Sequence, residues 1–219
     1  AATGHVIPPF TTGAAAARWE HTVLWAQNTM IVWGGLDANY ERISSGKRYD
    51  PVDNSWAPVN AVGAPEARFG HTAVWTGSEM IVWSGSNGGY FNDGGRYNPA
   101  GNSWAAVTTT GAPGGRAVHT AVWTGSVMIV WGGYNGGYFN DGGRYNPAAN
   151  TWTSVAFTGA PTARGGHTAV WTGSQMLVWG GRNNGSSFND GGRYNPAANT
   201  WTSVATSGAP SARSEHTAV

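Results

Sequence analysis

Short hydrophobic runs recur along the chain, and each is followed by glycine-rich or polar residues. The clearest run is Met-Ile-Val-Trp at residues 30–33, 80–83 and 128–131, with Met-Leu-Val-Trp at 176–179. Its final tryptophan stands at positions 33, 83, 131 and 179, so the intervals are 50, 48 and 48 residues. Runs of four apolar residues have the length of strands, and no segment keeps the 3.6-residue apolar period of a helix. The pattern therefore predicts a tandem array of all-β units, each of about 50 residues.

Each unit divides into four expected strands, which we call a to d. In the second unit they are expected at residues 71–75, 80–83, 95–97 and from Trp104 onward. The tripeptide Thr76-Gly77-Ser78 lies between strands a and b, where glycine favours a hairpin turn. Residues 98–102 begin with Asn-Pro and predict a second turn, between strands c and d. Four short strands per period are what one propeller blade requires.

A glycine doublet after strand b, followed later by a tyrosine seven positions before a tryptophan, resembles the kelch repeat. The doublet stands at 34–35, 132–133 and 180–181, and the second unit departs from it with Ser84-Gly85. The tyrosines are Tyr49, Tyr97, Tyr145 and Tyr194. The resemblance covers nearly the whole chain and implies an all-β, kelch-type β-propeller of four-stranded antiparallel blades. It leaves the function open, since kelch propellers serve as protein scaffolds, glycan binders and, less often, enzyme domains.

The repeats predict a single propeller domain or propeller fragment over residues 1–219. Four complete units run approximately over residues 17–66, 67–114, 115–162 and 163–211. Residues 5–10 align with a strand d, and residues 213–219 align with a strand a. Two arrangements fit these ends: a fragment of a larger ring, or a small ring in which the two terminal strands share one blade. In the first arrangement a further chain or subunit can complete the propeller.

The composition excludes several classes of function. There is no cysteine, so disulfides, thiolate metal sites and cysteine nucleophiles are excluded. The net charge is +1 without a basic run, so nucleic acid is not an expected partner, and no apolar stretch is long enough for a membrane span. Few charges combined with abundant Trp, Asn, Thr and Gly favour an extracellular or periplasmic protein of bacterial type. A cysteine-free chain also folds in the cytoplasm.

Two recurrent polar motifs are expected to be structural. One histidine per unit stands at the start of strand a. A metal-binding ring would need convergent ligands, so we interpret this histidine as a packing residue bonded to a neighbouring backbone. The Asn-Asp-Gly-Gly motif at 92–95, 140–143 and 189–192 lacks the further oxygen ligands of a calcium loop, so we interpret it as a turn. The recurrent tryptophans are expected to pack between blades. No metal or cofactor is therefore expected.

The candidate ligand-binding residues are arginines and aromatic residues. One arginine precedes each strand a: Arg18, Arg68, Arg116, Arg164 and Arg213. Antiparallel pairing places the b–c loop on the same face, with the aromatic residues Tyr90, Phe91, Tyr138, Phe139 and Phe188. Arginine beside exposed aromatic side chains is typical of recognition surfaces. The alternative, of equal weight, is that each arginine braces the next blade through backbone carbonyls. Bracing is the favoured role of the arginines in strand c, at positions 48, 96, 144 and 193.

No catalytic motif accompanies these residues, so the sequence predicts a non-catalytic recognition module. The expected partner is a protein or peptide, or a glycan, held on the face that carries the d–a and b–c loops. Two alternatives remain open: a structural or cell-surface assembly component, and the propeller domain of a larger secreted hydrolase or oxidase.

Overall fold

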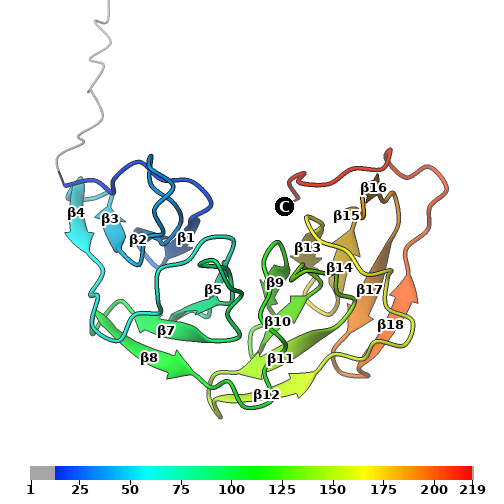
Figure 1. Cartoon of the computed structure of the whole chain (residues 1–219). Coiled ribbons are helices and arrows are strands. Elements are labelled where there is room, and N and C mark those ends of the chain that lie inside the picture. The colour runs from blue at the N-terminus through cyan, green and yellow to red at the C-terminus, as the bar shows by residue number, and fades with distance from the viewer. Residues whose placement is uncertain (1–12, 219) are drawn as a thin grey trace, which may run out of the picture.

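The computed structural model describes residues 13–218, which form four antiparallel sheets of four strands each (Figure 1). Blade 1 comprises β1 (Thr22–Ala26), β2 (Thr29–Trp33), β3 (Gly46–Asp50) and β4 (Ser55–Pro58). Blade 2 comprises β5 (Thr72–Trp75), β6 (Met80–Trp83), β7 (Gly94–Asn98) and β8 (Ser103–Val107). Blade 3 comprises β9 (Thr120–Trp123), β10 (Met128–Trp131), β11 (Gly142–Asn146) and β12 (Thr151–Ser154). Blade 4 comprises β13 (Thr168–Trp171), β14 (Met176–Trp179), β17 (Gly191–Asn195) and β18 (Thr200–Ser203).

The all-β prediction is confirmed, and each sheet is a meander of sequential strands. The expected strand c of the second unit is one residue longer at each end in the structure, because Gly94 and Asn98 also pair with their neighbours. A short hairpin of β15 (Arg182–Asn183) and β16 (Ser186–Ser187) forms within the b–c loop of blade 4. The described part of the chain contains no helix that is long and apolar enough to cross a membrane.

The two predicted terminal strands have different outcomes. Residues 5–10 lie outside the described residues. The prediction of a strand at 213–219 is wrong for residues 213–218, which are not a strand. A strand a pairs with strand b of its own blade, and this segment has no such neighbour among the described residues.

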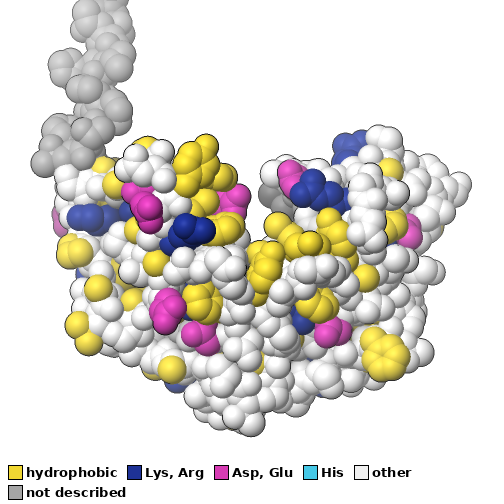
Figure 2. Space-filling model, viewed as in Figure 1, with side chains coloured by type: hydrophobic (Ala, Val, Ile, Leu, Met, Phe, Trp, Pro, Cys, Tyr) yellow, Lys and Arg dark blue, Asp and Glu magenta, His cyan; other side chains and the backbone are white. Residues whose placement is uncertain are grey.

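The blades follow one another along an arc, with the first strand of each blade innermost (Figure 1). Strand β1 contacts β5, β5 contacts β9, and β9 contacts β13. An open notch separates blade 1 from blade 4, and hydrophobic side chains gather along the floor of this notch (Figure 2). The four described blades are therefore an open arc and do not close into a small ring.

Hydrophobic packing between blades accounts for most of the core. In the cluster between blades 2 and 3, Ile81 and Trp83 on one sheet meet Met128 and Val130 on the next. The same positions form the other two clusters. Trp83 is completely buried, as are its equivalents Trp33 and Trp131. The predicted packing role of these tryptophans is confirmed, since large aromatic side chains fill the space between splayed sheets.

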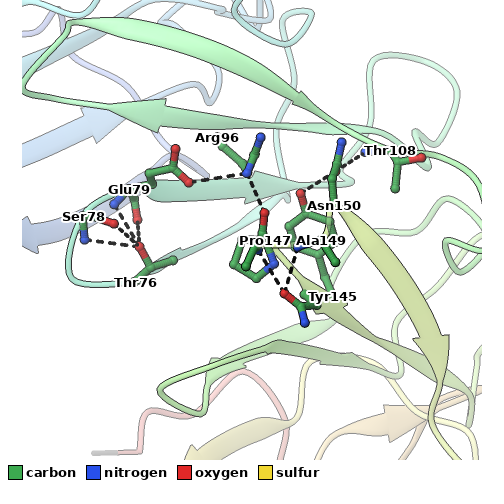
Figure 3. A network of polar contacts seen from close by, with 11 residues as sticks. Thr76, Ser78, Glu79, Arg96, Thr108, Tyr145, Pro147, Ala149 and Asn150 are labelled. Carbon is green, nitrogen blue, oxygen red and sulfur yellow. Dashed lines mark hydrogen bonds and ion pairs between the residues drawn. The ribbon is translucent and has the colours of Figure 1, made fainter.

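Polar contacts link the same neighbouring blades on the side of the a–b and c–d turns (Figure 3). Arg96 in β7 donates to the carbonyl of Pro147 in the next blade at 2.7 Å, and lies 3.8 Å from the Glu79 carboxylate. The Asn150 side-chain oxygen accepts the backbone N–H of Thr108 at 3.0 Å. Arg48 and Arg144 repeat the arginine contact, with Pro99 and Pro196. The predicted bracing role is confirmed for these three arginines, whereas Arg193 in blade 4 is exposed.

The departure from the glycine doublet in the second unit has a local explanation. Ser84 adopts a φ of 59°, where the equivalent Gly132 has 67°. Its hydroxyl lies 2.6 Å from the carbonyl of Phe91 and accepts the backbone N–H of Arg116 at 2.9 Å. These hydrogen bonds offset the cost of a left-handed backbone at a residue with a Cβ atom. The second glycine of the doublet has no room for a side chain, because a Cβ atom on Gly133 would lie 2.7 Å from the carbonyl oxygen of Ala117.

The recurrent histidines lie on the inner edge of the blades, and His71, His119 and His167 are buried there. In four of the five histidines the Nε2 atom is hydrogen-bonded to a threonine hydroxyl of the preceding blade, as in the 2.8 Å contact between His167 and Thr120. The His167 ring also meets the Trp131 ring edge-on, with centroids 5.2 Å apart. Their structural role is confirmed, and the group bonded to Nε2 is a side-chain hydroxyl, whereas the sequence predicted a backbone group. Burial lowers the pKa of His167 to about 3, helped by the nearby Arg164.

This pKa predicts a loss of stability in mild acid. The unfolded chain takes up a proton at His167 below about pH 6.5, whereas the folded chain does not. The free energy of unfolding therefore decreases as the pH is lowered. Between pH 7.5 and pH 5 the loss is about 2 kcal/mol for this histidine. Urea denaturation at both pH values measures it. His167→Asn keeps a hydrogen-bonding side chain without titrating, and its pH-dependent loss is expected to be smaller by about this amount. Equal losses in the two proteins would contradict the prediction.

Candidate functional site

The d–a loop and the b–c loop of each blade meet on one face of the arc. Isolated backbone bridges join them at equivalent positions: Trp19 with Leu36, Phe69 with Ser86, Ala117 with Tyr134, and Gly165 with Arg182. In blade 3 the bridge has two hydrogen bonds between Ala117 and Tyr134, of 3.0 and 2.9 Å. The same backbone bridge therefore recurs in every blade, while the side chains presented beside it differ.

The arginine at the entrance of strand a is buried in blades 2, 3 and 4. The Arg116 side chain has no exposed surface; its Nη1 donates to the carbonyl of Gly132 at 3.0 Å and to the Asp141 carboxylate at 2.8 Å. Arg68 and Arg164 repeat this arrangement with Asp93 and Asp190. We call the buried arginine with its carbonyl and carboxylate partners the arginine brace. The prediction that these three side chains line the mouth for a ligand is wrong. Each guanidinium donates to a carbonyl and pairs with a carboxylate of its own blade, and the carboxylate distances are typical of charge-assisted hydrogen bonds.

The bracing by these arginines also differs from the predicted alternative. Each guanidinium ties together two loops of its own blade and does not reach the next one. The link to the neighbouring blade uses the backbone instead: Gly85 donates to the Arg116 carbonyl at 3.0 Å, and Gly133 donates to the Arg164 carbonyl at 2.8 Å. The arginine residue therefore connects two loops and two blades.

Three of the predicted aromatic ligand contacts are part of the same brace. The guanidinium carbon of Arg116 lies 4.4 Å from the centre of the Phe139 ring. Phe91 and Phe188 cover Arg68 and Arg164 in the same way. A buried cation over an aromatic ring is stabilised by the ring quadrupole, so these phenylalanines have a structural function in the folded chain.

The arginines of the two ends lack the complete brace. Arg18 donates to the carbonyls of Gly34 and Ser45, and no aspartate pairs with it among the described residues. Arg213 is exposed, and within the described part of the chain its side chain forms hydrogen bonds only with Ser211. The five recurrent arginines thus form no common ring of exposed charge.

The Asn-Asp-Gly-Gly motif supplies the carboxylate of each brace, a role that the sequence did not indicate. Asp141 lies 2.8 Å from Arg116, and more than half of its side chain remains exposed. Within residues 13–218 no three side chains of His, Asp or Glu converge as metal ligands would.

The remaining aromatic residues line a cleft of about 300 Å³ at the centre of this face. We call it the tyrosine cleft. It is formed by Phe69, Tyr90, Tyr134 and Tyr138, with Glu20 and Arg182 at its margins. These residues come from all four blades, because the loops converge towards the arc's axis. Of the predicted site residues, the structure places Tyr90 and Tyr138 here.

The tyrosine rings pack edge-to-face. The Tyr134 ring centre lies 5.0 Å from that of Tyr138 and 6.4 Å from that of Tyr90. Within the described residues none of the three phenolic groups forms a hydrogen bond, and all three side chains are half-buried. A Cβ on Gly165 would lie 3.3 Å from the Tyr138 ring, so glycine at this position leaves room for that side chain.

Sequence reasoning missed Phe69 and Tyr134. A usable signal exists: the two residues between the recurrent arginine and histidine differ in every unit, reading Trp-Glu, Phe-Gly, Ala-Val, Gly-Gly and Ser-Glu. The residue after the glycine doublet differs as well, and it is the bridge partner of the first of these two. Variation at otherwise repeated positions marks the side chains that distinguish one blade from the next.

The charges at the margins of the cleft are unequal. Arg182 is neutralised by Glu215, whose carboxylate lies 2.9 Å from its guanidinium. Glu20 forms no ion pair among the described residues. Burial raises the pKa of Glu20, and repulsion by Glu215 raises it further. The cleft therefore combines aromatic faces with an excess of negative charge.

The buried brace predicts a large difference between equivalent arginines. Arg116→Ala leaves the buried carbonyl of Gly132 without a donor and should lower the free energy of unfolding by about 3 kcal/mol. Arg213→Ala changes the same repeat position where the side chain is exposed, and should change it by less than about 0.5 kcal/mol. Urea denaturation of the two variants measures both. Arg116→Lys should fall between them, because an ammonium group cannot form the same forked contacts. Equal effects of the two alanine variants would contradict the brace.

Comparison with known proteins agrees with the repeat pattern. The model of the KLHDC2/KLHL20/DRC7 Kelch-repeats domain matches residues 5–156 and 70–219, two overlapping spans that together cover almost the whole chain. A search among curated proteins gave no match. Four blades with the same glycine turns, inter-blade tryptophans and strand order provide the structural counterpart of this match. The chain belongs to the kelch-repeat family.

Proposed function

We propose that this chain is a non-catalytic binding module that takes up a segment of another protein in the tyrosine cleft. Kelch repeats generally mediate protein–protein interaction. The observation that carries the proposal is the convergence of the blade-specific side chains on one cleft. Tyr90, Tyr134 and Tyr138 offer aromatic faces and phenolic groups with no partner in the described residues, and tyrosine is enriched among residues that dominate binding.

Position on the scaffold supports the same proposal. The loops that carry the cleft are held by the arginine brace and the bridges, so their side chains are presented by a rigid frame. Loops fixed on a rigid scaffold are common binding sites, because sequence can change there without disturbing the core.

The opposite face is a weaker candidate although its grooves are larger. A groove of about 760 Å³ runs between blades 3 and 4, lined by residues such as Thr124, Arg144 and Asn195. An equivalent groove lies between blades 2 and 3, with Thr76 and Arg96 at the matching positions. The lining arginines already brace the next blade. Grooves that repeat with the packing geometry follow from the architecture and need no ligand to explain them.

A glycan is the alternative ligand in the same cleft, since sugars also stack on tyrosine rings. The protein ligand is favoured by the half-buried Phe69 at the cleft wall and by the usual role of kelch repeats. We propose no catalytic role, and from composition we propose an extracellular or periplasmic location.

We further propose that another chain or subunit can add to the arc at blade 4. Val170, Leu177 and Trp179 lie on the outer face of this blade and are partly exposed. The equivalent side chains Ile129 and Trp131 in blade 3 are completely buried by the next blade. A partner with a blade-like sheet would bury the face of blade 4 in the same way.

Display of a random peptide library, followed by titration, tests the proposed function. Peptides selected on the folded chain should bind Tyr138→Ala at least about fivefold more weakly, since loss of a central aromatic contact costs at least about 1 kcal/mol. Ser126→Ala, in a turn on the opposite face, should bind as tightly as the original chain. A glycan array run in parallel separates the two ligand classes. Peptides that bind Tyr138→Ala normally, or that are lost with Ser126→Ala, would place the binding site elsewhere.

A further inference from the structure

Building on the proposed function, we infer that the tyrosine cleft selects a partner segment carrying a lysine or arginine side chain, which its aromatic faces and the Glu20 carboxylate would hold together. The arrangement of rings, the position of the free carboxylate and the pairing of the cleft's exposed arginine with another carboxylate each support this specificity.

The rings form an aromatic wall with more than one orientation. Tyr134 is inclined by 61° to Tyr138 and by 74° to Tyr90. Rings at such angles present the face of one beside the edge of another, so a group entering the cleft meets at least one π-face. Cations are attracted to these faces by the ring quadrupole, and tyrosine-lined cages are known to recognise ammonium groups.

The Glu20 carboxylate lies at the inner margin of the same cleft. A Cβ placed on Gly70 would be 3.7 Å from Glu20 Oε2 and 3.3 Å from the Ala117 side chain. Glu20 from blade 1 therefore reaches over blade 2 towards blade 3, and the small residues Gly70 and Ala117 leave the approach open. Its backbone is fixed there, because the Gly70 N–H donates to the Glu20 carbonyl at 3.4 Å.

The positive groups near the cleft do not oppose a cation. The Arg182 guanidinium is occupied by Glu215 at 2.9 Å, so the pair has no net charge. Arg68 and Arg116 are completely buried, and each is paired with an aspartate at 2.8 Å. The cleft thus has an aromatic lining and one carboxylate without a counter-ion among the described residues, a combination complementary to a primary ammonium or guanidinium group and not to a carboxylate.

A matched set of short peptides tests the inference directly. The probes are acetyl-Gly-Lys-Gly-amide and the same peptide with norleucine, which keeps the alkyl chain and lacks the ammonium group. Binding is followed by ¹H–¹⁵N NMR titration of the full chain. We expect the lysine peptide to shift the amide signals of Tyr134 and Tyr138 and to bind at least tenfold more tightly than the norleucine peptide. Equal binding of the two peptides would overturn the inference.

Three variants identify the groups responsible. Glu20→Gln should weaken the lysine peptide at least threefold and leave the norleucine peptide unchanged; because Glu20 is exposed, this change does not affect the core. Tyr134→Phe keeps the ring face and should bind the lysine peptide normally, whereas Tyr134→Leu should lose at least fivefold. Lysine binding that is unaffected by Glu20→Gln and Tyr134→Leu would overturn the inference.

The library selection separates this inference from the proposed function. Enrichment of lysine or arginine in peptides that depend on Tyr138 supports both. Peptides that depend on Tyr138 but lack basic residues support the binding module and overturn the cation specificity. Selected peptides that are indifferent to Tyr138→Ala overturn both.

Discussion

The arrangement of the loops in blades 2, 3 and 4 depends on one buried guanidinium in each blade. In blade 3, Arg116 binds a carbonyl at the end of strand b, a carboxylate of the b–c loop and the face of a phenylalanine, while its own carbonyl accepts a hydrogen bond from blade 2. A buried charge is costly unless it is paired and hydrogen-bonded, and these contacts require the two loops to hold their positions relative to each other. The geometry of the whole loop face follows from that requirement.

This constraint separates the residues that build a blade from those that distinguish one blade from the next. Arginine, the aspartate of the b–c loop, the phenylalanine and the histidine occupy repeated positions, and in blades 2 and 3 the arginine contacts recur with the same distances within a few tenths of an ångström. The two positions between the arginine and the histidine make no such contacts. Among them Glu20 and Val118 are exposed and Phe69 is partly exposed, and substitution of such side chains costs little stability. Phe69, Val118 and Glu20 occupy these positions, which explains why the cleft has a composition of its own on a repeated scaffold.

The same contacts between blades repeat at every internal interface, and on blade 4 some of the groups that make them lack a partner among the described residues. Each internal interface combines a hydrophobic cluster, an arginine bonded to the carbonyl of a proline and a histidine bonded to a threonine. Repeated nearest-neighbour interfaces of this kind make the stability of an array approximately a sum of local terms. On blade 4 the same groups are present with fewer partners: Arg193 is exposed and Leu177 is half-buried. A face built for a blade is thereby left partly open to solvent.

The sequence by itself determined the strands, the turns and the packing tryptophans, because these depend on local signals. Apolar runs of four residues, Thr-Gly-Ser turns and the 48-residue interval specify a blade without knowledge of its neighbours. It also indicated the bracing role of Arg96 and the presence of Tyr90 and Tyr138 on a loop face. Only the tertiary structure decided the role of Arg116, since its partner Asp141 is 25 positions away and the distance between them depends on how the two loops fold together. The tyrosine cleft was likewise beyond the sequence: its margins, Glu20 and Arg182, belong to blades 1 and 4, and only the curvature of the arc brings them to one place.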